Sequence, residues 1–509
     1  MSAHKIIGHV VGETTHSEVE FTAKEPPKVG QYVFIPYTVD GGERLALAMV
    51  ESSRIGNPLL SYPTVTPEFV EKIKQYAPER TEYIIGVARI LSWVDTLLDR
   101  KEAETPKMPP KPGTPVYEAS EQVLSKIFGK RSKEDGRVKL GWLANHPGVE
   151  VYVDVDSIVS RHLAILAVTG AGKSNTVFVL VDRIVNELGG TVVLFDLHNE
   201  YDDVAGENTK IIEPKIHPST LTLGELYGLL GLDENATKQR IYLKEVYNEL
   251  EEVRLKRPHE FLREISKRLK SRLISSKSSD KSLDSLYLKF ESFMEDYGET
   301  IISVDVSPNL TSIIEPGKAN VFRLGSVGVE VADVIAYHYL DRLLYERKRF
   351  VAEGSGGYPV PVLAVLEEAH ILLPRDRSTL TKEVTGRIAR EGRKFGVGLC
   401  LVSQRPKKLD DDALSQANNK IVMRLVEPQD QRYVQAASET LSDELLRLLP
   451  SLNIGEAIIL GMMTPIPALV KIEKAEKKRR GGDIFAHKEW AEKRRGSEQE
   501  KTIASSMIM

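Results

Sequence analysis

A loop with the residue types of a phosphate cradle lies at residues 167–174, which read Ala-Val-Thr-Gly-Ala-Gly-Lys-Ser. The spacing is that of a Walker A loop with alanine in place of the first glycine. A short apolar run precedes the loop and a helical pattern over residues 175–188 follows it, which is the context that this motif requires. Glycine lets backbone N–H groups curl around phosphates, and the following helix points its positive end at the anion. The loop therefore predicts a phosphate-binding site, and the strand, loop and helix in register argue against a glycine-rich turn that binds nothing.

The lysine and the serine are the residues of this loop with chemistry of their own. Lys173 is expected to reach the β- and γ-phosphates, and the Ser174 hydroxyl is expected to hold Mg²⁺. The positions that demand glycine are 170 and 172, and both carry it. ATP and Mg²⁺ are the predicted cofactors. The predicted ATP-binding residues of this segment are Thr169, Gly170, Ala171, Gly172, Lys173, Ser174 and Asn175.

Two other apolar runs end in acidic residues. Residues 362–366 lead into Glu367 and Glu368, and residues 191–195 lead into Asp196. A P-loop enzyme needs carboxylates at the ends of neighbouring strands, to steer Mg²⁺ and to orient the attacking water. Because adjacent strand residues point in opposite directions, Glu367 and Glu368 are not expected to face the site in the same way. We assign Glu367 to the Mg²⁺ shell through water, Glu368 to the catalytic base, and Asp196 to support of the metal or the water.

Each of these assignments has a simpler alternative. An acidic pair after a core strand can be a solvated loop, and only its combination with the Walker A loop favours a catalytic role. His198 and His370 could suggest a metal site, but they stand alone, without cysteine or paired-histidine spacing. Structural or hydrogen-bonding roles are therefore expected for both histidines.

A basic helix and a polar strand end provide further candidates. Residues 381–394 predict a helix on which Arg390 and Arg393, three positions apart, share one side. Such helices commonly face solvent or make salt bridges, but in an oligomeric ATPase an arginine can enter the neighbour's site and stabilise the transition state. Gln404 ends the next apolar run, where it could sense the γ-phosphate. Arg161, just before the P-loop strand, offers another cation at an interface.

The elements that must position these residues predict an α/β fold. Short apolar runs at 163–167, 191–195, 361–366 and 397–402 alternate with helical patterns and read as parallel strands buried on both faces. Residues 119–474 are therefore predicted to form a RecA-like P-loop ATPase core. Charged, helix-periodic sequence at about 218–300, exemplified by 245–274, predicts a helical insertion with a solvated face.

The two ends of the chain differ from this core. Residues 1–118 are predicted to form a small N-terminal β-barrel with a linker, because strand-like runs such as 5–11 and 31–36 are separated by turn signals and the stretch 105–115 is rich in proline. Residues 475–509 form a polar tail with basic runs. The chain has 41% hydrophobic residues, a net charge of −4 and a single cysteine, Cys400. With no signal peptide pattern and no long apolar run, a cytoplasmic protein without membrane association is expected.

Together these motifs resemble the HerA family, the archaeal member of the HerA/FtsK group of DNA translocases. The resemblance rests on the set Asp-Leu-His-Asn-Glu-Tyr at 196–201, Glu-Glu-Ala-His at 367–370, Arg-Glu-Gly-Arg-Lys-Phe-Gly at 390–396 and Ser-Gln-Arg-Pro at 403–406. Segments 7–12 and 29–34 are similar to the family's β-barrel, the HAS-barrel. The similarity spans nearly the whole chain and is weakest in 210–300 and in the tail.

The resemblance implies a homohexameric ring that encircles double-stranded DNA and moves it at the expense of ATP. It implies a partnership of the barrel with the nuclease NurA, and action in DNA-end resection alongside the Mre–Rad complex. By the family's pattern, Lys173, Asp196 and Glu368 match ATPase positions. Arg393 matches the arginine finger that acts in trans, with Arg390 as the alternative on the same helix side, and Arg161 matches a second arginine near a neighbour's nucleotide.

Other functions remain open at this level. A motor of the same group can act on another polymer, as in secretion or conjugation, and a nucleotide-gated scaffold would bind ATP with little turnover. Glu368 argues against the scaffold, because a scaffold needs no water-activating carboxylate. The loops after the Asp196 and Glu368 strands are the expected sources of DNA contacts. The cations nearest to the second loop are Arg375, Arg377 and Lys382.

Overall fold

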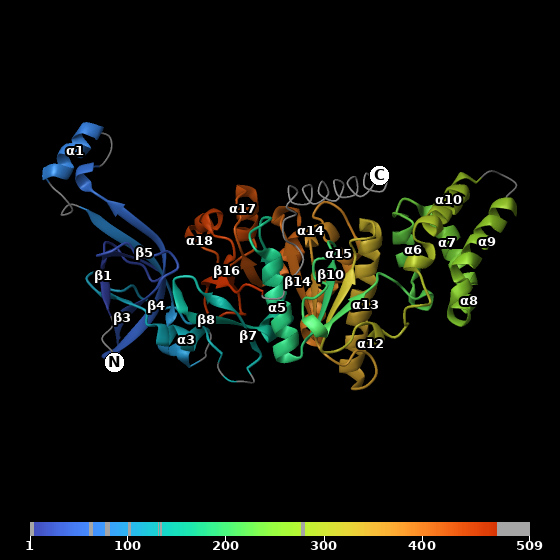
Figure 1. Cartoon of the computed structure of the whole chain (residues 1–509), viewed down its shortest axis with the longest axis horizontal. Helices are drawn as coiled ribbons and strands as arrows, with labels where there is room; N and C mark the ends of the chain where they lie inside the picture. The colour runs from blue at the N-terminus through green and yellow to red at the C-terminus, as the bar shows by residue number, and fades with distance from the viewer. Residues whose placement is uncertain are drawn as a thin grey trace, which may run out of the picture.

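The computed structural model describes residues 5–60, 65–76, 82–99, 103–130, 132, 135–275 and 280–475. Figure 1 shows an elongated chain with a barrel at the left, a large sheet with its helices in the middle, and a group of helices at the right. Within the described residues, no helix combines the length and the apolar character needed to cross a membrane. The predicted tail lies outside the described residues, apart from Ala475.

The N-terminal part is a closed barrel with strand order β1-β2-β5-β4-β3-β6. The predicted strands at 5–11 and 31–36 appear as β1 and β3, which confirms the small barrel. The proline-rich stretch is hydrogen-bonded to β1 at Val10 and leads into β6, a closing strand that the sequence pattern did not indicate. The strands are β1 (Ile6–Val11), β2 (Glu18–Ala23), β3 (Tyr32–Val39), β4 (Gly42–Gly56), β5 (Tyr83–Trp93) and β6 (Pro115–Glu118).

The barrel shares its core with the rest of the chain. One set of its buried residues, including Phe21 and Ile35, fills the barrel. Another set, including Tyr32 and Met49, belongs to the cluster that runs through the ATPase-like core. The Tyr32 hydroxyl also donates a hydrogen bond of 2.7 Å to the carbonyl of Pro467. The barrel is therefore packed onto the core rather than linked to it as a separate unit.

The central element is an 11-stranded sheet with the order β11-β12-β10-β13-β14-β9-β15-β16-β17-β7-β8. The strands from β11 to β15 in this order pair in parallel, and those from β15 to β8 pair antiparallel. Their bounds are β7 (Arg137–Leu143), β8 (His146–Asp154), β9 (Leu163–Leu166), β10 (Thr191–Asp196), β11 (Thr209–Ile212), β12 (Ala319–Arg323), β13 (Val362–Leu366), β14 (Val397–Ser403), β15 (Asn419–Val422), β16 (Glu456–Leu460) and β17 (Ala468–Ile472).

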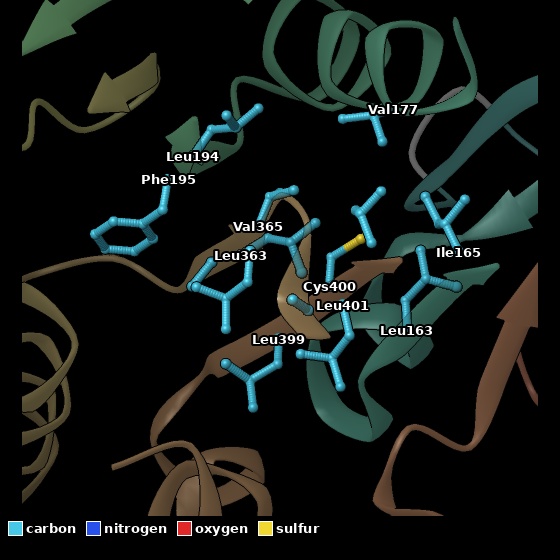
Figure 2. Packing of buried hydrophobic residues seen from close by; sticks show 14 of the residues in the cluster. Leu163, Ile165, Val177, Leu194, Phe195, Leu363, Val365, Leu399, Cys400 and Leu401 are labelled. Atoms are coloured by element: carbon cyan, nitrogen blue, oxygen red, sulfur yellow. The ribbon is translucent and has the colours of Figure 1, made fainter. Parts of the chain in front are cut away.

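The four strands predicted from apolar runs are β9, β10, β13 and β14, and they are parallel and buried throughout. Such strands read as continuous apolar runs because helices cover both faces of the sheet. Figure 2 shows side chains of these strands packed in one cluster with Val177 of α5 (Lys173–Leu188), the helix that follows the Walker A loop. This packing holds the carboxyl ends of β9, β13 and β10 at one edge, with β14 between β9 and β13.

Helices surround the sheet and form the insertion. The predicted helix 381–394 is α15 (Leu380–Phe395), with Val384 and Ile388 buried as expected. The longest helix is α13 (Val329–Glu353). The remaining helices of the core and the barrel are α1 (Pro67–Tyr76), α2 (Val94–Leu98), α3 (Glu121–Phe128), α4 (Val155–Arg161), α11 (Gly298–Ile301), α12 (Leu310–Ile313), α14 (Ala369–Leu372), α16 (Asp411–Gln416), α17 (Pro428–Ala436) and α18 (Asp443–Leu448).

The insertion consists of α6 (Leu223–Leu229), α7 (Thr237–Glu249), α8 (Glu251–Lys256), α9 (Phe261–Ser275) and α10 (Lys281–Asp296). The periodic stretch 245–274 is not one helix, because Pro258 begins a 3₁₀ turn between α8 and α9. Proline cannot donate the backbone hydrogen bond of a helix interior, so the chain breaks there. The packing of α9 through Leu262, Ile265 and Leu269 leaves its lysines and arginines on the solvent side, as expected.

Candidate active site

The Walker A loop adopts the backbone that its glycines permit. Gly170 and Gly172 have φ angles of 77° and 111°, a region that side chains with a Cβ rarely adopt. A Cβ at Gly172 would also lie only 3.0 Å from the Met423 side chain. The Ala171 carbonyl accepts a hydrogen bond of 2.9 Å from Gly455, which fastens the loop to the turn before β16. The prediction that positions 170 and 172 need glycine is therefore supported by their geometry.

Lys173 lies between the two acidic residues that follow β13. Its side chain is largely buried, and its Nζ contacts Glu367 Oε1 at 3.3 Å and Glu368 Oε1 at closer range. Both carboxylates are buried as well. A buried carboxylate is stable only with a paired charge or hydrogen bonds, so the lysine and the two acids depend on one another.

The alternation expected for Glu367 and Glu368 does not hold. The strand ends at Leu366, and Glu368 has a φ of 47°, in the left-handed region. This turn brings both carboxylates to the same lysine, whereas an extended backbone would separate them. A non-glycine residue in this conformation is uncommon and is found most often where surrounding structure enforces it, as at functional sites.

Two histidines hold these carboxylates. His198 Nδ1 lies 2.9 Å from Glu367 Oε2, and this hydrogen bond raises the pKa of His198. His370 Nδ1 lies 3.2 Å from Glu368 Oε2 and 3.2 Å from the Ser403 hydroxyl. Burial by itself raises the pKa of Glu368, but His370 and Lys173 outweigh it and lower the pKa to about 2. The expected hydrogen-bonding roles of both histidines are thus confirmed.

The acidic residues and Ser174 provide donors that fit Mg²⁺. Ligand atoms of His198, Glu367 and Glu368 lie within 4.8 Å of one another. Mg²⁺ is a hard ion that prefers carboxylate and hydroxyl oxygens to imidazole nitrogen. Glu368 Oε2 is buried, and its 3.2 Å contact with His370 does not have the geometry of a hydrogen bond, nor does any other described group supply one. The carboxylates and the Ser174 hydroxyl are therefore the better match for a magnesium ion, and His198 serves to orient Glu367.

Asp196 stabilises the loop that follows β10. It is fully buried, and its two carboxylate oxygens accept hydrogen bonds from the backbone N–H groups of His198 at 3.1 Å and Tyr201 at 2.9 Å. Burial raises the pKa of Asp196 to about 6. The strand β10 lies beside β13, as expected, so Asp196 is close to Glu367 and Glu368. Its carboxylate oxygens also accept the hydrogen bonds that hold the loop after β10.

The remaining residues predicted near the phosphates fall into two groups. Gln404 Oε1 accepts a hydrogen bond from the Thr169 hydroxyl, so the end of β14 meets the Walker A loop. Asn175, in contrast, is engaged by the C-terminal segment. Its side-chain amide donates to the Glu473 carbonyl at 2.7 Å, and its oxygen accepts from Ala475 N–H at 2.9 Å. This engagement was not foreseen for a residue predicted to bind ATP.

The three predicted arginines lie at the other end of the parallel strands. Arg161 ends α4, which precedes β9, and Arg390 and Arg393 lie on α15, which precedes β14. The Walker A loop and Gln404 follow these same strands. Arg390 and Arg393 are exposed, and among the described residues neither makes an ion pair. Arg387, on the same helix, does form a salt bridge, with Asp341 at 2.5 Å.

The family of the chain follows from comparison with known proteins. Residues 138–343 match the family model described as the central domain of the helicase HerA, and residues 349–473 match that of the HerA-like C-terminal domain. A DNA double-strand break repair helicase HerA from Sulfolobus acidocaldarius is 40% identical over 97% of this chain and 98% of its own length. A probable helicase from Methanocaldococcus jannaschii is 39% identical over 99% of this chain and 97% of its own length.

The chain belongs to the HerA helicase family.

Solved structures similar to this HerA-family chain share its fold. VirB4 of Thermoanaerobacter pseudethanolicus has a TM-score of 0.52 and 17% identity, and the match covers 67% of this chain and 98% of VirB4. The plasmid coupling protein TrwB, in complex with ADP and Mg²⁺, has a TM-score of 0.50 and 15% identity over 71% of this chain and 94% of TrwB. These similarities confirm the α/β fold predicted for the core.

The residues predicted to contact DNA in this HerA-family chain differ in whether they already form ion pairs within the protein. Lys382 pairs with Asp410 at 2.7 Å, and Arg375 pairs with Asp411 at 3.2 Å. Arg377 is exposed and has no ion pair among the described residues. A second group of cations, which the sequence pattern did not indicate, lies on the segment after β14. This segment runs beside the segment after β13, and the two are joined by a 2.9 Å hydrogen bond from Arg375 N–H to the Lys408 carbonyl. These exposed cations are Arg405 and Lys408.

Removal of the lysine should unbalance this buried charge cluster. Lys173→Ala leaves two buried carboxylates without their cation, so the free energy of unfolding of the nucleotide-free protein should fall by about 3 kcal/mol at pH 7. Glu368 has a folded-state pKa below its unfolded value, so in the wild type it stabilises the protein above about pH 4.5, and this stabilisation is lost as the pH falls towards 2. In the variant, the contributions of Lys173 that lower the pKa of Glu368 are lost, so this pKa should rise. The difference in the free energy of unfolding between the wild type and Lys173→Ala should therefore become smaller as the pH is lowered from 7 towards 4. Thermal unfolding experiments over this pH range measure it.

A matched control is Lys348→Ala, which removes a surface pair with Glu391. Exposed pairs contribute less than about 1 kcal/mol, so this variant should unfold nearly as the wild type does at every pH. If Lys173→Ala is as stable as Lys348→Ala at pH 7, the lysine does not hold the two carboxylates in solution.

Proposed function

We propose that this chain is the subunit of an ATP-driven motor that moves along double-stranded DNA. The observation that carries the proposal is the buried contact of Lys173, in a Walker A loop, with Glu367 and Glu368. This set of groups can bind phosphates and activate water, and it occurs here in a chain of the HerA helicase family. The names of the relatives, which include DNA double-strand break repair helicases, support DNA as the substrate.

The resting contacts suggest how the site changes when ATP arrives. Lys173 is the cation best placed to meet the β- and γ-phosphates, and in doing so it must loosen its contact with Glu368. Loss of that contact removes one of the interactions that lower the pKa of Glu368, so the carboxylate becomes a better proton acceptor. Glu368 then accepts a proton from the attacking water, and Gln404 reports on the γ-phosphate through Thr169.

Mg²⁺, when bound, neutralises charge on the phosphates and orients them. Ser174 and Glu367 are the residues that would hold it, Glu367 through water. His198 keeps Glu367 oriented, because its ring hydrogen-bonds Oε2 of the carboxylate, whereas Lys173 contacts Oε1. Asp196 contributes by holding the loop that carries His198 in place. The ADP and Mg²⁺ bound in the structurally similar TrwB support the choice of nucleotide and metal.

We infer a ring because Arg393, within the part of the chain that the structure describes, makes no ion pair. The exposed guanidinium lies at the sheet edge opposite its own Lys173, so it can reach a nucleotide only across an interface. A homohexamer, as the family resemblance implies, gives every site such a neighbour. Arg161 lies at the same sheet edge, at the end of a helix that contacts α15, so it can join the same interface.

The barrel is the part that we assign to a protein partner, the nuclease NurA, in DNA-end resection with the Mre–Rad complex. Support comes from the resemblance and from apolar side chains exposed on and near the far end of the barrel, including Ile55, Phe69 and Tyr83. Loss of NurA co-purification in Ile55→Asp, without loss of ATPase activity, is the result that this assignment requires.

A motor of secretion or conjugation type is the second candidate, because VirB4 and TrwB share the fold. The 40% identity to a repair helicase over nearly the full length favours the DNA motor. Hydrolysis that responds to duplex DNA distinguishes the two candidates.

The central test is ATP hydrolysis with and without duplex DNA. The wild type should be stimulated by duplex DNA. Glu368→Gln should bind ATP but hydrolyse it about 10²- to 10⁴-fold more slowly, because the water loses its acceptor. The matched variant Glu367→Gln should instead raise the Mg²⁺ concentration needed for hydrolysis. Normal hydrolysis in Glu368→Gln together with an inactive Glu367→Gln would show that the two roles are exchanged.

The trans role of Arg393 can be tested by mixing subunits. Arg393→Ala should keep ATP binding and oligomer size but lose hydrolysis by about 10³-fold or more. Mixed with inactive Lys173→Ala subunits, it should regain activity, because some interfaces then pair an intact P-loop with an intact arginine. Lys394→Ala, at the next exposed cation, is the control and should stay active. Rescue with Arg390→Ala but not Arg393→Ala would move the finger by one helical turn.

Duplex binding should depend on salt but not on sequence, because the sequence shows no zinc-finger spacing and no homeodomain-like helix, and the exposed cations are expected to contact phosphates. Arg377→Ala and Arg405→Ala should each weaken duplex binding and lower the slope of log affinity against log salt by about 1. Arg54→Ala, which removes a barrel pair with Glu20, is the control and should bind as the wild type does. Unchanged slopes in both test variants would place the DNA elsewhere on the protein.

A further inference from the structure

The segment from Asp196 to Tyr201 contains more functional groups than the proposed mechanism uses. Asp196 fixes the backbone of the segment at His198 and Tyr201, and His198 orients Glu367. Tyr201, at the end of the segment, has no role in this account. Its side chain is fully buried, although a tyrosine hydroxyl is polar.

The Tyr201 hydroxyl lies beside the hydroxyl of Ser174 and near the charge of Glu367. Its contact with the Ser174 hydroxyl lacks the geometry of a good hydrogen bond, and no other described group pairs with it. Burial raises the pKa of Tyr201 well above its ordinary value, so the group is a neutral donor. A buried hydroxyl without a partner is costly, and such groups in native proteins usually await a water, an ion or a ligand.

The neighbours of this hydroxyl indicate which partner it awaits. Ser174 and Glu367 are the two residues that would hold Mg²⁺, and this ion usually keeps several of its waters when it binds with a nucleotide. We propose that Tyr201 is a positioning residue of the magnesium site, and that its hydroxyl donates to the shell of oxygen atoms that Mg²⁺ brings to Ser174. This inference rests on the proposed nucleotide site. It also explains why the segment ends in tyrosine rather than phenylalanine.

The test uses Tyr201→Phe, which keeps the buried ring and removes only the hydroxyl. In the full-length protein, thermal unfolding is followed with ADP at increasing Mg²⁺ concentrations, and Mn²⁺ binding in the presence of ADP is measured by electron paramagnetic resonance. The metal concentration for half-maximal stabilisation should rise about fivefold, the effect of one hydrogen bond. The melting temperature without nucleotide and metal should stay within about 1 °C of the wild type, because the hydroxyl makes no well-formed hydrogen bond with the described residues that the change would remove.

Tyr358→Phe is the matched control, since Tyr358 is equally buried but donates a hydrogen bond of 3.2 Å to the Ile314 carbonyl. It should lower the melting temperature without nucleotide and leave the metal requirement unchanged. If Tyr201→Phe behaves like Tyr358→Phe, or if its metal requirement equals that of the wild type, Tyr201 is only structural and the inference is overturned. If the wild type itself gains no stability from ADP with Mg²⁺, the proposed nucleotide site fails and the inference fails with it.

Discussion

The contact of one buried lysine with two buried carboxylates is the constraint around which the central sheet is organised. Charged groups of this kind persist out of water only when their partners are held firmly. The Walker A loop must therefore deliver Lys173 to the same point at which β13 ends, and β14 lies between the two strands. The left-handed turn at Glu368, the two histidines and the loop fixed by Asp196 all serve this meeting point.

The two ends of the parallel strands carry different functional groups. The carboxyl ends of the parallel strands carry the lysine, the acids and Gln404, while the amino ends are preceded by the helices that bear Arg161, Arg390 and Arg393. Within one subunit, these arginines therefore lie at the opposite end of the strands from Lys173 and the two carboxylates. If subunits form a ring, hydrolysis depends on contact between neighbours, and this couples each chemical step to the geometry of an interface.

Much of this arrangement could be predicted from the sequence because the signals are local. Strands covered on both faces appear as unbroken apolar runs. The Walker A glycines, Lys173 and the helix of Arg393 can each be recognised from a few neighbouring residues. What could not be predicted depends on contacts between distant segments or on single backbone angles. The turn at Glu368 contradicts the simple alternation of a strand, Asn175 is held by residues some three hundred positions away, and the short strand β6 closes the barrel only because β1 and β3 are already in place. Tyr201 lay within a recognised motif, yet only its buried, unpartnered hydroxyl points to a role.

The shared core of the barrel has a consequence for how this architecture can diversify. Since Tyr32 and Met49 pack into the same apolar cluster as the ATPase-like sheet, the barrel cannot be exchanged as an independent module without rebuilding the face beneath it. Substitutions in the barrel should disturb the core least on the side turned away from the sheet. A chimera that carries a foreign barrel on this core would have to keep the buried residues shared with the core, such as Tyr32 and Met49. Only the outer strands and the helix could then be changed.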